Sequence, residues 1–124
     1  MTEVENYVKR LLEGVKRTEP DVDFIYMTYP CQVTFYMGKY NGYVGIPPSH
    51  PFHGDHSIDC DVHGGITFHR MGTKEDNRLE DHFYVGFDTG HAQDMDDPKS
   101  QDYVIEETKN LAEKLYLMAH KQLS

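Results

Sequence analysis

The chain has 124 residues and a formal net charge of -9, a length that fits one domain, residues 1–124, built on one core. No apolar run approaches the roughly 18 residues of a membrane span, and the N-terminus lacks the basic and apolar regions of a signal peptide, so we expect a cytoplasmic protein without membrane contact. The acidic charge also argues against non-specific nucleic-acid binding, because it repels a phosphate backbone.

An amphipathic helix is predicted near the start of the chain, over residues 3–16. Apolar residues recur there at helical spacing on one face, and Thr2 with Glu5 resembles a capping box. Pro20 stands beyond the predicted end of this helix. The segment that follows, residues 24–27, fits either a short extended piece or a loop.

Five short strands are predicted next, from alternation of apolar and polar residues. They lie at residues 32–37, 43–46, 58–63, 66–70 and 82–88. A Lys-Tyr-Asn-Gly turn at 39–42 is expected to join the first two strands. Residues 47–51 are rich in proline, which cannot donate to a strand ladder, so they are predicted as a loop. The polar residues 71–81 and the acidic residues 90–101 are predicted as two further loops.

A second amphipathic helix is predicted over residues 103–120. Its apolar face consists of Val104, Thr108, Leu111, Leu115 and Met118. Successive strands with short connections favour an antiparallel sheet, and two helices with one apolar face each need a surface to cover. We therefore expect an α+β fold, with an antiparallel sheet of about five strands and an N-terminal and a C-terminal helix packed on one face.

The two cysteines, Cys31 and Cys60, both lie in apolar segments. A disulfide is not expected in a cytosolic chain, so both are interpreted as small core residues. Cys60 is accordingly predicted to be buried and unreactive.

Side chains alternate along a strand, which sorts the predicted strand residues into two faces. The residues expected to face the helices are Val44, Ile46, Ile58, Cys60, Val62, Phe83, Val85 and Phe87. The residues expected on the opposite face are Tyr43, Gly45, Asp59, Asp61, His63, His82, Tyr84, Gly86 and Asp88. The two glycines on that face are expected to leave gaps beside the polar side chains.

Gly64 and Gly65 are predicted to reverse the chain. A two-residue hairpin would place apolar residues with the acids, so an odd-length loop or a bulge fits the pattern better. Such a loop would align His63 with Thr67 and Asp61 with His69.

Histidines and carboxylates are concentrated in the second half of the sheet region, and seven of the eight histidines lie between His50 and His91. Imidazole with carboxylate is a ligand set for Zn²⁺, Mn²⁺ or Fe²⁺, and the candidate metal ligands are Asp61, His63, Asp88 and His91. A metal-dependent hydrolase would activate water there and use Asp61 or Asp59 as base. The sequence contains neither HExxH nor a CxxC pair, and the same pattern also fits a solvated polar sheet face.

A wider ligand-binding surface is predicted around the same cluster. Its residues are Tyr43, His50, Asp61, His63, Tyr84, Asp88 and His91. His50 also fits a second interpretation, in which it braces its own proline-rich loop together with His53 and His56.

The segments GYVGIP, HPFHG, IDCDVHGGITF and GFDTGHAQD resemble an uncharacterised family of small proteins carried by bacteriophages and prophages. The resemblance covers roughly residues 42–94. On this match the shared polar positions are His50, Asp61, His63, Asp88, His91 and Asp94. The resemblance implies a phage or prophage origin and a place in the host cytoplasm, and it implies no specific activity.

The leading hypothesis from the sequence is a protein that acts by binding a small ligand or a host protein through the His/Asp face, with or without a divalent metal ion. The first alternative is a metal-dependent hydrolase that uses the same cluster. The second is a structural or assembly protein. The sequence leaves the ligand and the oligomeric state open.

Overall fold

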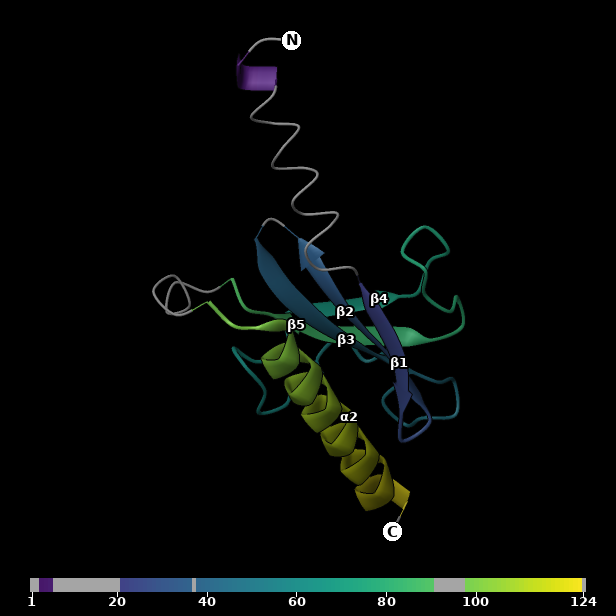
Figure 1. Ribbon diagram of the computed structural model, residues 1–124. Helices are drawn as coiled ribbons and strands as arrows, with labels where there is room; N and C mark the ends of the chain where they lie inside the picture. The colour runs from purple at the N-terminus through teal and green to yellow at the C-terminus, as the bar shows by residue number, and fades with distance from the viewer. Residues whose placement is uncertain (1–2, 6–20, 37, 91–97, 124) are drawn as a thin grey trace.

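The computed structural model describes residues 3–5, 21–36, 38–90 and 98–123 (Figure 1). The predicted N-terminal helix begins within this part of the chain, because residues 3–5 are helical. Its remaining residues, 6–16, and its predicted packing on the sheet lie outside the described residues.

The described chain forms a five-stranded antiparallel sheet and a long C-terminal helix (Figure 1). The strands are β1 (Val22–Tyr26), β2 (Tyr29–Tyr36), β3 (Lys39–Ile46), β4 (Phe68–Met71) and β5 (Phe83–Asp88), and the helix is α2 (Gln101–Leu123). Their order in the sheet is β1-β2-β3-β5-β4, and every neighbouring pair is antiparallel. The predicted α+β class and its antiparallel sheet of five strands are confirmed.

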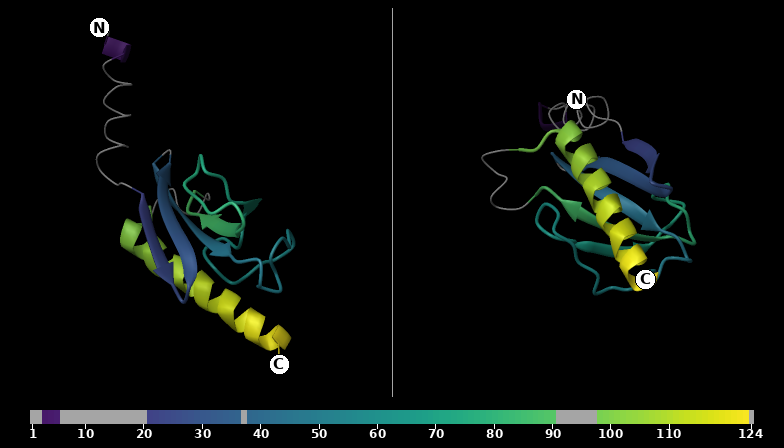
Figure 2. Two further views of the ribbon diagram at one scale, coloured as in Figure 1. Left: turned by 90° about the vertical axis from the view of Figure 1, so that its right-hand side faces the viewer. Right: turned by 90° about the horizontal axis from the view of Figure 1, so that it is seen from below.

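Helix α2 lies diagonally across one face of the sheet, where it contacts β2 and β3 (Figure 2). The predicted apolar face is the one that packs, since Val104, Leu111 and Leu115 are fully buried. Gly42 of β3 allows this close approach: a β-carbon there would overlap Thr108 Oγ1. Thr108 satisfies its own buried hydroxyl by donating to the carbonyl of Val104 at 2.6 Å.

Residues 24–27 are predicted as either an extended piece or a loop. In the structure, residues 24–26 belong to β1, and Met27 begins a hairpin turn. β1 and β2 are joined by Met27 and Thr28, whose φ angles are 53° and 71°. Two successive residues with positive φ match a type I′ turn, whose twist suits a two-residue hairpin. β2 therefore starts at Tyr29, before the predicted start.

The predicted turn at residues 39–42 is wrong, because β3 already begins at Lys39. The ladder pairs Tyr36 with Lys39, so the chain reverses between these two residues, and Gly38 has a φ of 82°. Asn41 and Gly42 are typical turn residues by composition, yet both lie within β3, and at Gly42 the close approach of Thr108 of α2 leaves no room for a β-carbon.

The predicted strand at residues 58–63 is also wrong, although its alternation is right. This segment is irregular over residues 58–60 and then bends and turns, and local bonds hold it: Oδ1 of Asp59 accepts the N–H groups of Cys60 and Ile66, both at 2.9 Å. Such side-chain bonds compete with a strand ladder. Ile58 and Val62 are still buried, as predicted, whereas Cys60 is only half-buried.

The predicted pairing of residues 58–63 with 66–70 does not occur. β4 pairs with β5 instead, and His69 lies opposite Val85 rather than Asp61. The imidazole of His69 bonds to the carbonyl of Ile58 at 2.7 Å, which ties the neighbouring loop to the sheet edge. Gly64 and Gly65 do reverse the chain, with φ angles of 71° and 77°.

Candidate functional site

The face of the sheet opposite α2 is packed, where the sequence predicted gaps beside its glycines. Gly86 lies opposite Tyr43 in the β3–β5 ladder, and Gly45 lies opposite Tyr84. Each tyrosine ring covers its partner glycine: a β-carbon on Gly86 would stand 2.5 Å from Tyr43 Cδ1, and one on Gly45 would stand 2.9 Å from Tyr84 Cζ. The rings therefore occupy the space that the glycines leave.

The guanidinium of Arg78 lies over this aromatic surface. Arg78 comes from the loop between β4 and β5, and its guanidinium carbon lies 4.2 Å from the ring centroid of Tyr43, 5.0 Å from that of Phe68 and 5.6 Å from that of Tyr84. Only 8% of its side chain is exposed. A desolvated cation over aromatic faces is attracted by their quadrupoles, so the guanidinium holds the loop against the sheet.

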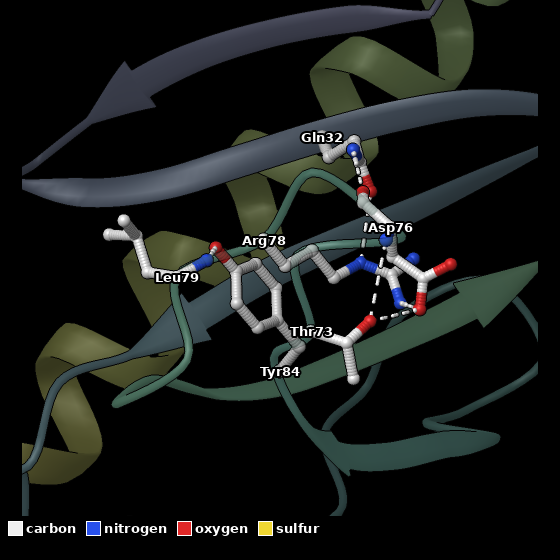
Figure 3. Close-up of polar contacts among 6 residues, drawn as sticks. All are labelled: Gln32, Thr73, Asp76, Arg78, Leu79 and Tyr84. Carbon is white, nitrogen blue, oxygen red and sulfur yellow. Dashed lines mark hydrogen bonds and ion pairs between the residues drawn. The ribbon is translucent and has the colours of Figure 1, made fainter.

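A buried glutamine bonds the same loop to β2 (Figure 3). Gln32, 4% exposed, donates through Nε2 to the carbonyl of Asp76 at 3.1 Å and accepts from Arg78 Nε at 3.0 Å. Both ends of the amide are thus satisfied, as burial requires. The loop is braced internally by Thr73, whose hydroxyl donates to Oδ2 of Asp76 at 2.8 Å.

A groove of about 440 Å³ lies beside this network, between the loop and the outer face of the first two strands. It is lined by Asp23, Phe24, Ile25, Pro30, Cys31, Gln32, Lys74, Asn77, Arg78, Leu79 and Tyr84. Ile25 and Leu79 form apolar lips, with exposed fractions of 76% and 52%. Asn77 Nδ2 donates to Asp23 Oδ2 at 3.3 Å, which links the loop to β1 at the groove. We call this feature the outer groove.

Two ionisable side chains of the outer groove are held in their neutral forms. Burial raises the pKa of the Cys31 thiol to about 12, and its Sγ–H donates to the carbonyl of Tyr29 at 3.5 Å. Burial also raises the pKa of Tyr84, whose hydroxyl accepts the N–H of Leu79 at 3.2 Å. Neither group supplies a nucleophile near neutral pH, because the thiolate and not the thiol is reactive.

Of the residues predicted to bind a ligand, Tyr43 and Tyr84 belong to the packing of the outer face, and His50 is a structural bridge. His50 is 7% exposed and accepts the N–H of Phe52 on Nδ1 at 3.0 Å. Nε2 therefore carries the proton and donates to the carbonyl of Leu115 at 3.0 Å, which ties the loop to α2. Burial lowers the pKa of His50, consistent with a neutral ring.

Asp61 and His63 lie next to α2. The ring of His63 shares a hydrogen bond of 3.0 Å with the hydroxyl of Tyr103, and the backbone N–H of His63 donates to Glu107 at 2.9 Å. Asp61 is exposed and lines a second hollow, of about 680 Å³, beside the C-terminal half of the helix. We call this second feature the helix hollow.

Asp88 is the last residue of β5. Because side chains alternate along a strand, Asp88 lies on the same face of the sheet as Tyr84 and on the opposite face from the buried Phe87. Its carboxylate accepts from the hydroxyl of Thr67 at 3.1 Å and from the N–H of Gly90 at 2.9 Å. These bonds attach Asp88 to its own strand end, while those of His63 attach it to the helix. These contacts do not bring the predicted metal ligands Asp61, His63 and Asp88 together.

His91, the fourth predicted metal ligand, lies outside the described residues, and so does Asp94. Among the residues that the structure describes, no group of three or more His, Cys, Asp or Glu side chains is placed to hold a metal ion. The predicted Zn²⁺, Mn²⁺ or Fe²⁺ site therefore stays a prediction.

Sequence reasoning misses Arg78 and Gln32. Gln32 has the pattern of an ordinary strand residue, and Arg78 stands in a polar loop for which solvation is the natural expectation. Neither shows a motif, because their contacts join residues 46 positions apart in the chain. The one available signal is that Arg78 is a charged residue in a segment between two predicted strands. Such residues are too common for this signal to identify a site.

No protein-family model, curated protein or solved structure matches the chain. The resemblance to small phage and prophage proteins therefore stays a prediction from the motifs. Within the described residues, no helix has the length and apolar character needed to cross a membrane.

Proposed function

We propose that this protein acts by binding a small molecule in the outer groove. One observation carries the proposal: a groove of about 440 Å³ whose wall is held in place by a buried cation and a buried amide. Small-molecule sites typically measure about 300–1,000 Å³ and combine apolar walls with a few fixed polar groups. The outer groove has both features.

The apolar part of the ligand would meet the lips at Ile25 and Leu79 and the floor near Pro30 and Tyr84. The floor is held in place at Tyr84, since its ring is packed over Gly45 and its hydroxyl is bonded to the loop backbone. A preformed site loses less conformational entropy on binding than a mobile one, which favours specific recognition.

The proposal keeps the binding role that the sequence suggested and moves it from the His/Asp face to the groove around Arg78. A phage or prophage origin, a host cytoplasmic location and a host protein as the partner remain proposals that rest on the motif resemblance alone. The metal-dependent hydrolase needs His91, and none of the contacts of Asp61, His63 or Asp88 favours it over binding.

The test is a fragment library of aromatic and aliphatic molecules, screened against the full chain by ¹H–¹⁵N NMR. We expect hits that shift the amide signals of Ile25, Asn77 and Leu79. Leu79→Asp, at an exposed lip, should weaken these hits, whereas the matched control Leu117→Asp, exposed beside the helix hollow, should leave them unchanged. Hits that respond only to Leu117→Asp would place binding at the helix hollow and refute the proposal.

A further inference from the structure

Arg78 makes fewer hydrogen bonds than its guanidinium offers. An arginine carries five N–H donors on three nitrogens. In this structure Nε donates to Gln32 at 3.0 Å and Nη1 lies 3.5 Å from Asp76 Oδ2, while the third nitrogen has no dashed contact in Figure 3. No described residue accepts a hydrogen bond from that third nitrogen.

This shortage matters because the group is buried. The side chain of Arg78 is 92% covered, from its 8% exposure, and three aromatic rings take up its surroundings. Buried charges are normally paired and hydrogen-bonded, since an unsatisfied ionised donor loses its hydration without compensation. The open donors therefore call for an acceptor that the described protein atoms do not supply.

The lining of the outer groove also carries more cations than carboxylates. Asp76 is the one carboxylate in an ion pair with Arg78 among the described residues, and its Oδ2 already accepts from Thr73 at 2.8 Å. Lys74, which pairs with Glu80 at 3.5 Å, adds a second cation to the lining of the outer groove, and the groove's own carboxylate, Asp23, is engaged by the amide of Asn77. The groove thus offers one engaged acid and two cations.

We infer that the small molecule bound in the outer groove carries an oxyanion, a carboxylate or a phosphate, which accepts hydrogen bonds from Arg78 while the apolar part of the molecule lies between Ile25, Leu79 and Tyr84. Guanidinium donors pair with such oxyanions in short, charge-assisted bonds. Lys74, at the exposed rim, would attract the same charge without fixing its orientation. This inference rests on the proposed function and names the class of its ligand.

The experiment compares probes of matched shape on the full chain by ¹H–¹⁵N NMR titration. Benzoate and neutral benzamide share the ring and differ in charge, and phenyl phosphate distinguishes a phosphate from a carboxylate. We expect benzoate or phenyl phosphate to shift the amide signals of Asn77 and Leu79 with an affinity about tenfold above that of benzamide. Arg78→Gln should abolish this preference.

Arg78 also holds the loop, so a second variant keeps the test open to refutation. Lys74→Gln changes a side chain that is 88% exposed, and it should lower oxyanion affinity without disturbing the fold. Lys114→Gln, a cation of the helix hollow, is the matched control and should change nothing at the outer groove. If benzamide binds the groove as tightly as the anions, or if Arg78→Gln keeps the preference, the inference fails while the proposed function stands. If neither anion shifts the groove signals, the inference fails as well, and the Leu79→Asp and Leu117→Asp pair decides the proposed function separately.

Discussion

The ring of Tyr43 lies directly on Gly86, its partner in the β3–β5 ladder. An aromatic ring over a cross-strand glycine restores the packing that the missing side chain would leave open. The same arrangement recurs along the ladder, where Tyr84 covers Gly45. Together the two pairs build the aromatic surface that the guanidinium of Arg78 contacts.

Gly86→Ala should destabilise the protein by about 1–3 kcal/mol, the usual cost of overpacking. The new β-carbon would stand 2.5 Å from Tyr43 Cδ1 and 2.6 Å from the carbonyl oxygen of Gly42, and the backbone oxygen cannot move aside easily. Chemical denaturation measures the free energy of unfolding, with the exposed Glu106→Ala as control. Unchanged stability in Gly86→Ala would contradict the close contact between Tyr43 and Gly86.

His50 should make stability depend on pH. Its pKa in the folded protein is lowered by burial, so the unfolded chain takes up a proton first as the pH falls. The contribution of His50 is therefore complete above its ordinary pKa of about 6.5 and is lost as the pH falls from there toward the lower folded value. Urea unfolding of the wild type and of His50→Gln between pH 7.5 and 5 measures this. We expect a shallower acid-side loss in the variant, and parallel curves would show that His50 does not titrate differently on folding.

Gln32→Ala should loosen the loop over the outer groove. It would leave the Arg78 Nε–H and the Asp76 carbonyl without their partner, at a cost of about 2–4 kcal/mol for two buried polar groups. Native-state hydrogen exchange should report faster exchange at the Leu79 amide, which is bonded to Tyr84. The exchange rate of the Leu111 amide, in the middle of α2, serves as the internal control. Equal acceleration at Leu79 and Leu111 would mean that the variant loses global stability rather than the local stability of the loop.

The two cysteines should differ in reactivity toward iodoacetamide in the native protein. Cys31 is 3% exposed with a thiol pKa raised to about 12, so it should stay unlabelled near pH 8. Cys60 is half-buried rather than fully buried as predicted, and its thiol donates to Met118 Sδ at 3.5 Å. Its pKa is raised as well, first by burial and then by Asp59, so it should react, but more slowly than an exposed cysteine. Peptide mass spectrometry after timed labelling separates the two sites, and faster labelling of Cys31 than of Cys60 would contradict the structure.

The sequence by itself determined the elements whose signal is local and periodic. The apolar stripe from Val104 to Leu115 predicted α2, and the alternation of Phe83, Val85 and Phe87 predicted both β5 and the side of it that belongs to the hydrophobic core. Hydrophobic burial drives such patterns directly, because each apolar side chain must reach the core whatever the rest of the chain does. The alternation of Ile58 and Val62 was informative for the same reason, even though their segment is not a strand.

Only the tertiary structure decided which segments became neighbours and what they built. The insertion of β5 between β3 and β4, the filling of the space at Gly86 by Tyr43, and the bonds from Gln32 to Arg78 all join segments that are separate in the chain. A local pattern carries no information on such contacts, since they depend on the register of whole strands and on the path of a loop. The outer groove is built from these contacts, so no motif in the sequence marked it.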